Sequence, residues 1–596
     1  MSVDPLDDRP RIPLFTGLLG GAILTFLFLI VAIAEIGWAV HVPIHVFVLP
    51  LALAGSCLVT RWGARFHFRR SGLVTLAVGA ILILLVAASA FISRAFFDVS
   101  FDGQGYHQEG VYQLAHAWNT LFTRYISPIS IDQNVKLIHF PKGAWIIGAA
   151  MYRLTGQIES AKFANLLLIC AAFCVALPVF VGLNKRLSAW PVAMAALVAA
   201  NPVAVCQVFT FYLDGQMASL LACLAALCYL SIAEGNPWID LLIFETAVLI
   251  IQLKFTGVVY AAVFLAGFIL LRAWKKRPLR RQVYVAILAL ELGTLVFGMN
   301  PYVFNFFENG HPFYPLFGHG DFARIILAPN TPPAFLSSSP AKNLAESMFS
   351  RSRDWPPGNT LKAPWQVDAS EWAVFEEPDV LVGGFGPLFP AALVLALILL
   401  GLSFLGPLLP GSSLPGVGVF ASRATGAVAA FAILILVGSV LPVSGCWWAR
   451  YAPQVWLVPL VALAALGCAG EMEGYSLPSP VGRGCPPADG RVRGHFIDFG
   501  HGSAMLRRLS WLVLLILLVD VGGIAVVNFR ANLAATRETK ESLDDLRSHA
   551  PFKVSFGYFR SNRFRLQEAG IPFVEDEMHL NCDPTVKEND DLCIGH

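Results

Sequence analysis

Apolar runs of about 20 residues recur along most of this chain, and each is long enough for a helix to cross the hydrocarbon of a bilayer. Of the 596 residues, 56% are hydrophobic and 14% are charged. A soluble globular protein has about 45–50% apolar and about 25% charged residues. So many apolar side chains do not fit into one water-soluble core. The pattern therefore predicts an all-α polytopic membrane protein.

The apolar runs predict roughly thirteen membrane-spanning helices. The first run is too long for a signal peptide and has no small-residue cleavage site after it, so we expect an anchor helix. The segment 239–271 is the least regular, because Gln252, Lys254 and Gly257 interrupt it. The predicted spans are 13–36, 43–60, 72–93, 162–182, 189–208, 216–233, 239–253, 256–271, 282–299, 386–405, 425–441, 453–469 and 509–528.

Clusters of Lys and Arg between the predicted spans indicate the orientation of the chain in the membrane. They fall in the segments 61–70, 185–186, 272–281 and 470–508. If the N-terminus is cytoplasmic, one alternation of the spans puts all four on the cytoplasmic side, as the positive-inside rule requires. The same alternation places outside the segments 94–142, 209–215, 300–385, 442–452 and all residues after 528.

The predicted organisation is a multi-span membrane domain, residues 1–528, followed by a small soluble extracytoplasmic α/β domain, residues 529–596. In the second part, a polar helical pattern at 531–548 precedes a strand–helix–strand pattern. Cys582 and Cys593 would lie in an oxidising compartment, so we expect a disulfide between them. The eleven cysteines include no C-x-x-C pair and no cluster with histidine, so no structural zinc site is expected.

The first large outer loop, 94–142, has acidic residues directly after a predicted span. Asp98 and Asp102 would lie at the membrane boundary, where a carboxylate is costly unless it has partners or a function. Gly103 and Gly105 would let the backbone turn sharply and approach a ligand. The apolar residues that follow recur at i, i+3, i+4 and i+7, which predicts an amphipathic helix on the bilayer surface.

Asp102 also has a purely structural interpretation, in which it caps that helix or pairs with Lys136 or Lys142. The composition of the loop favours a functional interpretation, because its charged residues are interleaved with aromatics and glycines. These residues are Asp98, Asp102, His107, Glu109, His116, Lys136, His139 and Lys142.

A second outer turn repeats part of this pattern, since Phe211-Tyr-Leu-Asp-Gly-Gln216 is similar to the segment from Phe101 to Gln104. Asp214 would stand at the outer end of a span. It is either the N-cap of the following helix or a second catalytic or binding acid, and these two roles are compatible.

A third outer segment, Cys446–Tyr451, combines aromatic residues with one charge. Trp447, Trp448 and Tyr451 fit the aromatic belt of a membrane interface. The guanidinium of Arg450 is well shaped to bind a phosphate. The alternative is that Arg450 extends to the lipid headgroups.

The long outer loop 300–385 has its own acids, arginines and tryptophans, and a loop of this length is usually functional. No Walker loop, Rossmann fingerprint, G-x-S-x-G or H-E-x-x-H motif occurs in a fitting context, so the sequence predicts no site for a soluble nucleotide. The net charge of +2 gives no reason to expect a nucleic-acid partner.

Taken together, these features resemble the GT-C class of membrane glycosyltransferases, which includes protein O-mannosyltransferases and lipid A aminoarabinose transferases. The resemblance covers the architecture of residues 10–530. At the level of motifs it rests on the acidic segment Phe97–Glu109 and on Arg450. In that class the first large loop normally follows the first span, whereas here it follows the third. Either two extra helices precede the core, or the span count differs.

The resemblance implies an inverting transfer of a sugar from a polyprenyl-phosphate donor to an extracytoplasmic glycan, lipid or protein acceptor. Asp102 would be the general base, with Asp98 and Glu109 as further catalytic acids. Those three carboxylates could share a divalent cation, although none is assigned. The remaining candidates would bind the donor phosphate (Arg450, Lys142 and His139) or the substrates (His107, Asp214, Gln104 and Tyr451).

The main alternative function is a transporter or flippase of a lipid-linked sugar, and a second is an assembly factor without activity of its own. Transporters tend to have charged residues within their spans. Here few ionisable residues fall inside the predicted spans, among them Glu35, Glu245 and Glu291. The acids gather in outer loops instead, which favours chemistry at the outer surface of a cell membrane.

Overall fold

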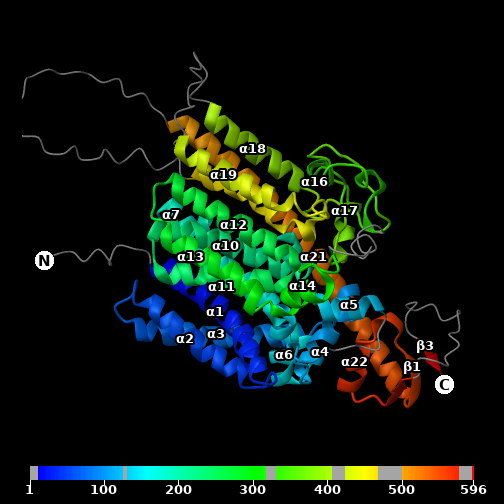
Figure 1. Ribbon diagram of the computed structural model, residues 1–596. Coiled ribbons are helices and arrows are strands. Elements are labelled where there is room, and N and C mark those ends of the chain that lie inside the picture. The colour runs from blue at the N-terminus through cyan, green and yellow to red at the C-terminus, as the bar shows by residue number, and fades with distance from the viewer. Residues whose placement is uncertain are drawn as a thin grey trace, which may run out of the picture.

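A computed structural model of the chain describes residues 11–124, 131–316, 330–405, 423–467, 500–575 and 593–595. Long helices form an elongated bundle, and a small α/β domain lies beside one end of it (Figure 1). The predicted disulfide cannot be located, because Cys582 lies outside the described residues.

Among the described residues, six helices have the length and apolar composition needed to cross a membrane. A bent pair of helices, whose parts meet at 69°, would make a seventh span. The chain is therefore an all-α membrane protein, as its apolar runs predict. The six are α1 (Arg11–Ala39), α3 (Ser71–Arg94), α7 (Ala164–Asn184) with the turn η2 (Ile158–Phe163), α10 (Asp214–Glu234), α12 (Phe255–Trp274) and α21 (Gly500–Ser548).

The bent pair and a set of shorter apolar helices complete the bundle. The bent pair is α13 (Arg280–Glu291) with η3 (Leu292–Val296), followed by η4 (Met299–Val303) with α14 (Phe304–Asn309). The shorter helices are α2 (Val48–Ala64), α8 (Ala189–Ala199), α11 (Pro237–Leu253), α18 (Phe389–Leu405), α19 (Arg423–Val440) and α20 (Leu457–Gly467).

Helix α1 is the most buried of the six membrane-length helices, and it packs against α2, α7 and α11. Small residues allow this close contact, as is common between membrane helices. A side chain at Gly20 would overlap Val175 of α7, and one at Gly21 would overlap Trp238 of α11. The predicted span 189–208 is interrupted after α8, where Asn201 caps the short helix α9 (Pro202–Cys206).

Short helices and turns gather at the same end of the bundle as the α/β domain (Figure 1). They are η1 (Gly103–His107), α4 (Gln108–Ala115), α5 (Ile131–His139), α6 (Gly143–Thr155), η6 (Pro333–Phe335), α16 (Pro340–Met348), α17 (Ser370–Ala373), η7 (Val374–Glu376), η9 (Ala449–Tyr451) and η10 (Pro453–Trp456).

The amphipathic helix predicted on the bilayer surface exists as α4, but its predicted location is wrong. Its apolar residues Val111 and Leu114 are buried, and α4 packs against α6 and the turn η2. Gly110 lies directly against the ring of Trp145 in α6. Protein, rather than lipid headgroups, therefore covers the apolar face of this helix.

The two ends of the bundle differ in their chemistry. Helix α10 has 21 residues and so spans about 30 Å, close to the thickness of the hydrocarbon core. Beside its C-terminal end, Asn236 contacts His67, and Arg281 of the basic segment 272–281 pairs with Asp240. Two of the predicted cytoplasmic loops therefore meet at this end, opposite the end where α10 begins at Asp214.

The C-terminal domain starts on α21, which runs without a break past residue 528. Strand β1 (Phe552–Ser555) pairs in parallel with β2 (Phe573–Glu575) and antiparallel with β3 (Cys593–Gly595). The turn η12 (Gly557–Phe559) and helix α22 (Asn562–Glu568) connect β1 to β2. The strand–helix–strand order agrees with the sequence prediction.

Candidate functional site

Arg450 lies at the centre of a buried cluster of three carboxylates. Its Nε donates to Asp214 at 2.8 Å, its Nη1 to Asp379 at 2.5 Å and its Nη2 to Asp102 at 3.2 Å. All three donor nitrogens of the guanidinium are therefore engaged by carboxylates. Charge-assisted hydrogen bonds of this kind are the strongest that side chains form.

Four segments that are distant in the sequence supply the cluster. Asp102 precedes the turn η1, and Asp214 is the first residue of α10. Asp379 follows η7 in the long loop 300–385, and Arg450 belongs to η9. The cluster thus joins three segments that the sequence marks as candidates, 94–142, 209–215 and 442–452, together with one acid that was not predicted.

Aromatic rings and a second cation enclose the cluster. The guanidinium of Arg450 lies 4.5 Å from the ring of Tyr212, and the rings of Trp448 and Tyr451 also contact it. Lys254 pairs with Asp214, and its ammonium stands 4.3 Å from the centre of the Tyr451 ring. The interruption of the apolar run at Lys254 is therefore a feature of the site.

The three acids differ in their access to solvent and in their protonation. The side chain of Asp214 is 1% exposed, whereas those of Asp102 and Asp379 are 18% and 17% exposed. Burial raises the pKa of Asp379 to about 7, because Asp214 and Asp102 also disfavour its negative charge and Arg450 offsets only part of this effect. Asp379 therefore titrates near neutral pH.

Asp102 behaves in the opposite way. Burial alone would raise its pKa, but the charges of Arg450 and Lys136 outweigh burial and hold the pKa below the usual value. Its Oδ2 accepts the bond from Arg450, and the structure records no bond to its Oδ1 among the described residues. Asp102 is therefore an ionised carboxylate with one oxygen available to a substrate.

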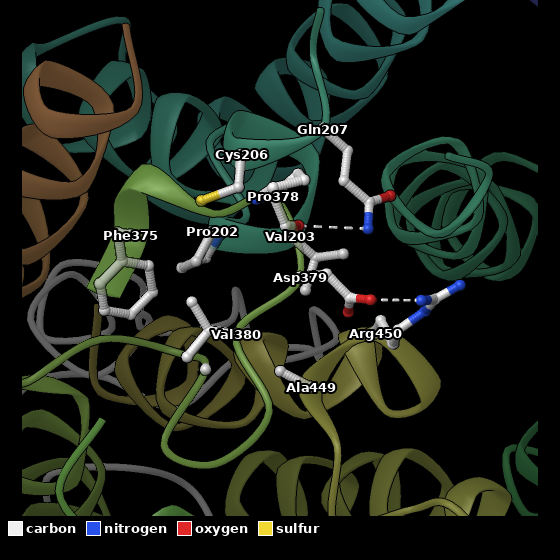
Figure 2. A pocket seen from close by; sticks show the side chains of 11 residues that line it. Pro202, Val203, Cys206, Gln207, Phe375, Pro378, Asp379, Val380, Ala449 and Arg450 are labelled. Atoms are coloured by element: carbon white, nitrogen blue, oxygen red, sulfur yellow. Dashed lines mark hydrogen bonds and ion pairs between the residues drawn. The ribbon is translucent and has the colours of Figure 1, made fainter. Parts of the chain in front are cut away.

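A small cavity opens beside the cluster (Figure 2). Asp379 and Arg450 line one side, and Gln207 and Phe375 lie around the rest. Oδ1 of Asp379 is buried without a hydrogen-bond partner among the described residues. A polar group that entered this cavity could bond to that oxygen.

Asp98 has a positioning role in the structure. Its Oδ1 accepts a bond from Ser100 N at 2.8 Å, and its Oδ2 accepts one from Phe211 N at 2.7 Å. Asp98 therefore ties the segment that carries Asp102 to the segment that carries Asp214. Its side chain is fully buried, and burial raises its pKa.

Glu109 connects the acidic loop to the C-terminal domain. Glu109 is fully buried and pairs with Arg563 of α22 at 2.7 Å. Arg565 of the same helix pairs with Glu159 at 3.0 Å and donates to the carbonyl oxygen of Asp98. The C-terminal domain is thus attached to the acidic loop by two buried arginines.

Lys142 and His139 lie together in a separate polar cluster. Lys142 donates to the carbonyls of Ile138 and Phe140 and to Oδ1 of Asn300, and His139 bonds to Asn305 at 2.7 Å. Burial lowers the pKa of Lys142 to about 7 and that of His139 to about 4. The structure does not bring these two side chains into contact with Arg450.

His107 and Gln104 lie in and beside the turn η1. His107 is buried and accepts a bond from Nε1 of Trp145 at 2.7 Å, and burial lowers its pKa to about 3. Gln104 is half-buried, and its backbone N–H bonds to the carbonyl of Ser100. A neutral His107 lies near the charge of Asp102, which opposes the lowering of its pKa.

The shared cation site considered for Asp98, Asp102 and Glu109 does not form. Asp98 bonds to backbone amides, Asp102 to Arg450 and Glu109 to Arg563. No group of three or more His, Cys, Asp or Glu side chains in the described part of the chain could hold a metal ion.

Sequence reasoning missed Asp379 and the arginines Arg563 and Arg565. Asp379 lies in a long polar loop with several other acids, where no spacing distinguishes it. The arginines could have been noticed as two basic residues two positions apart in the short helical pattern of the tail. No protein-family model matches this chain, and no curated protein matches its sequence.

Proposed function

We propose that this protein is a membrane glycosyltransferase that moves a sugar from a polyprenyl-phosphate donor to an extracytoplasmic acceptor. The observation that carries the proposal is the cluster of Asp102, Asp214 and Asp379 around Arg450. It lies at the beginning of a membrane-length helix, where a lipid-anchored donor and a water-soluble acceptor could meet.

Asp102 is the proposed general base. It is ionised, partly exposed and held in place by Arg450, and its Oδ1 could accept the proton of an acceptor hydroxyl. The hydroxyl oxygen would attack the anomeric carbon as the bond from that carbon to the phosphate oxygen breaks. The configuration at the anomeric carbon would invert, and polyprenyl phosphate would leave.

Arg450 is proposed to bind the departing phosphate as well as the acids. Asp379 has a pKa of about 7, so its protonation would release one arm of the guanidinium near neutral pH. A phosphate oxygen could then take the place of the Asp379 carboxylate. Fixed positive charge at a developing anion is an effective way to stabilise a transition state.

The proposed orientation places the cluster outside and the N-terminus in the cytoplasm of a cell membrane. The contacts among residues 67, 236, 240 and 281 at the opposite end support it, because basic loops favour the cytoplasmic side. In this arrangement the shorter apolar helices would complete about thirteen spans. We assign no cofactor.

Transport of the same lipid-linked sugar is the alternative function. It is supported by a buried acid inside the bundle, since Glu245 of α11 accepts a bond from Thr25 of α1 at 2.6 Å. Ionisable residues inside a membrane often mark transport pathways. A transporter would have no evident use for the cluster of three carboxylates around Arg450, whereas a transferase would.

Donor turnover tests the proposal. The full chain would be purified in detergent, and lipids that co-purify with it would be identified by mass spectrometry. The lipid found would then be supplied with candidate acceptors. Release of polyprenyl phosphate with transfer of the sugar supports a transferase. Movement of the intact donor across liposomes, without its cleavage, would instead identify a transporter.

A further inference from the structure

Three aromatic rings lie together where the C-terminal domain meets the acidic loop. The ring of Phe101 stacks on that of Tyr558, with 4.9 Å between their centres, and the ring of Phe559 meets it at 87° and 5.4 Å. A Cβ at Gly105 would come within 3.3 Å of the Tyr558 ring, so glycine permits this close approach. Tyr558 and Phe559 belong to η12, so the domain supplies two of the three rings of this aromatic cluster.

Phe101 is the open member of the aromatic cluster. Tyr558 covers one face of its ring, yet 54% of Phe101 is exposed. Tyr558 and Phe559 are half-buried. The opposite face of the Phe101 ring is therefore accessible to a ligand, and aromatic side chains are a common lining of sites for organic ligands.

The open ring lies next to the proposed base. Phe101 directly precedes Asp102, and the Cα atoms of consecutive residues are about 3.8 Å apart. The side chain of Asp102 is 18% exposed, and its Oδ1 is available to a substrate. A ligand with several linked rings that stacks on Phe101 can therefore present its next ring to Asp102.

Ion pairs hold the two parts of the aromatic cluster together. Arg563 of α22 pairs with Glu109 at 2.7 Å, and Arg565 pairs with Glu159 at 3.0 Å. All four of these residues are buried. The rings are therefore held in place before a ligand arrives, which lowers the entropic cost of binding.

The surroundings of the aromatic cluster are polar. The preceding membrane-length helix α3 ends at Arg94, and Figure 1 shows the C-terminal domain beside the end of the bundle. The ammonium of Lys136 lies 3.4 Å from the hydroxyl of Tyr558, and Arg560, next to Phe559, pairs with Glu575. Charged groups so close to the rings favour a polar ligand over lipid chains.

We propose that Phe101, Tyr558 and Phe559 bind the acceptor, and that the acceptor is a glycan with one sugar ring stacked on Phe101. The face of a sugar ring carries C–H groups, which pack on the electron-rich face of an aromatic ring. The inference rests on the proposed function, in which a hydroxyl of this glycan gives its proton to Asp102. The donor phosphate stays with Arg450.

Glycan binding can be measured without turnover. The full chain, in a detergent without a sugar headgroup, would be titrated with fluorescently labelled pentasaccharides of glucose, mannose, galactose and arabinose. At least one of them should bind. Phe101→Leu keeps an apolar side chain but removes the ring, so it should weaken that binding about 3- to 10-fold. Phe101→Trp keeps a flat ring and should bind at least as well as the parent protein.

Two variants of Tyr558 test the contribution of the C-terminal domain. Tyr558→Leu removes the ring that supports Phe101 and should also weaken binding, whereas Tyr558→Phe keeps the stacked ring and should not. Phe307→Leu is the matched control, because Phe307 on α14 is 79% exposed and lies outside the aromatic cluster. Its affinity for the same pentasaccharide should equal that of the parent protein.

The proposal is overturned if no pentasaccharide binds, or if Phe101→Leu binds it as tightly as Phe101→Trp does. A labelled short-chain polyprenyl phosphate should bind Phe101→Leu and the parent protein equally. An equal loss of affinity for both ligands would also overturn the proposal, because Phe101 would then support the whole site. Glycan binding that depends on Phe101 without sugar transfer would keep this site and remove the transferase proposal. Sugar transfer to a lipid or protein without glycan binding would do the reverse.

Discussion

The guanidinium Nη2 of Arg450 lies 3.2 Å from the carboxylate Oδ2 of Asp102, although 348 positions separate the two residues. The same guanidinium reaches Asp214 and Asp379. One cation therefore connects the loop 94–142, the start of α10 and the loop 300–385. Changes at any of these positions should affect the others.

Replacement of Asp102 by Asn should abolish most donor turnover while leaving the protein folded. Loss of a general base costs about 10²- to 10⁴-fold in rate. Release of polyprenyl phosphate would be measured, with thermal unfolding as the check on folding. Asp368→Asn is the control, because that acid forms an exposed ion pair with Arg351. Near-normal turnover in Asp102→Asn would remove Asp102 from the role of base.

Replacement of Arg450 by Ala should destabilise the protein by about 3–5 kcal/mol, because it leaves buried carboxylates without their cation. Adding Asp379→Asn to Arg450→Ala should restore part of this loss, since one of those carboxylates is then neutral. Thermal unfolding in detergent of Arg450→Ala, Asp379→Asn and the double variant would give the coupling free energy between the two side chains. Additive effects would show that the two side chains do not interact.

Arg450→Lys keeps the positive charge but loses the forked guanidinium. It therefore tests whether phosphate binding needs that geometry or only the charge. We expect weaker donor binding in this variant. An unchanged affinity for the donor in Arg450→Ala would refute the phosphate role of Arg450.

Asp379→Asn should change how stability depends on pH. The pKa of Asp379 is raised from 3.8 to about 7 in the folded protein, so the folded state holds this proton more tightly than the unfolded state. The contribution of Asp379 to stability is therefore largest at low pH and falls as the pH rises between these two values. The free energy of unfolding of Asp379→Asn minus that of the parent protein should therefore be larger at about pH 8 than at about pH 5. If the melting temperatures of the variant and the parent protein differed by the same amount at both pH values, the raised pKa would be contradicted.

Gly103→Ala should disturb the site through Asp98. A Cβ at Gly103 would overlap the Asp98 carboxylate that accepts the bond from Phe211 N. We expect a loss of about 1–3 kcal/mol, as for other overpacked positions. Gly522→Ala on α21 meets no atom within 4 Å and serves as the control. It should be neutral or stabilise the protein by about 0.5–1 kcal/mol.

Arg565→Ala should loosen the C-terminal domain, because Glu159 and the carbonyl of Asp98 lose a buried partner. Hydrogen exchange should increase in residues 97–107 and in α22. Arg351→Ala is the control, because it removes an arginine that pairs with Asp368 in the loop 300–385, and exchange in the same segments should not change. If both variants exchange alike, the arginines of α22 do not hold the acidic loop.

The sequence by itself determined that this is a helical membrane protein. Apolar runs and the basic segments between them are local properties, so they can be recognised without knowledge of tertiary contacts. Asp102, Asp214 and Arg450 were also recognisable, because each is a charge in an aromatic segment next to an apolar run. The predicted bilayer-surface position of α4 was wrong, since an amphipathic face does not reveal whether lipid or protein covers it.

Only the tertiary structure decided which charges meet. The partners of Arg450 lie 348, 236 and 71 positions away, and no local spacing encodes contacts of that range. The same holds for the docking of α22 on Glu109, 454 positions apart. Burial then fixed the chemistry, because a carboxylate that loses water depends on the few charges packed around it.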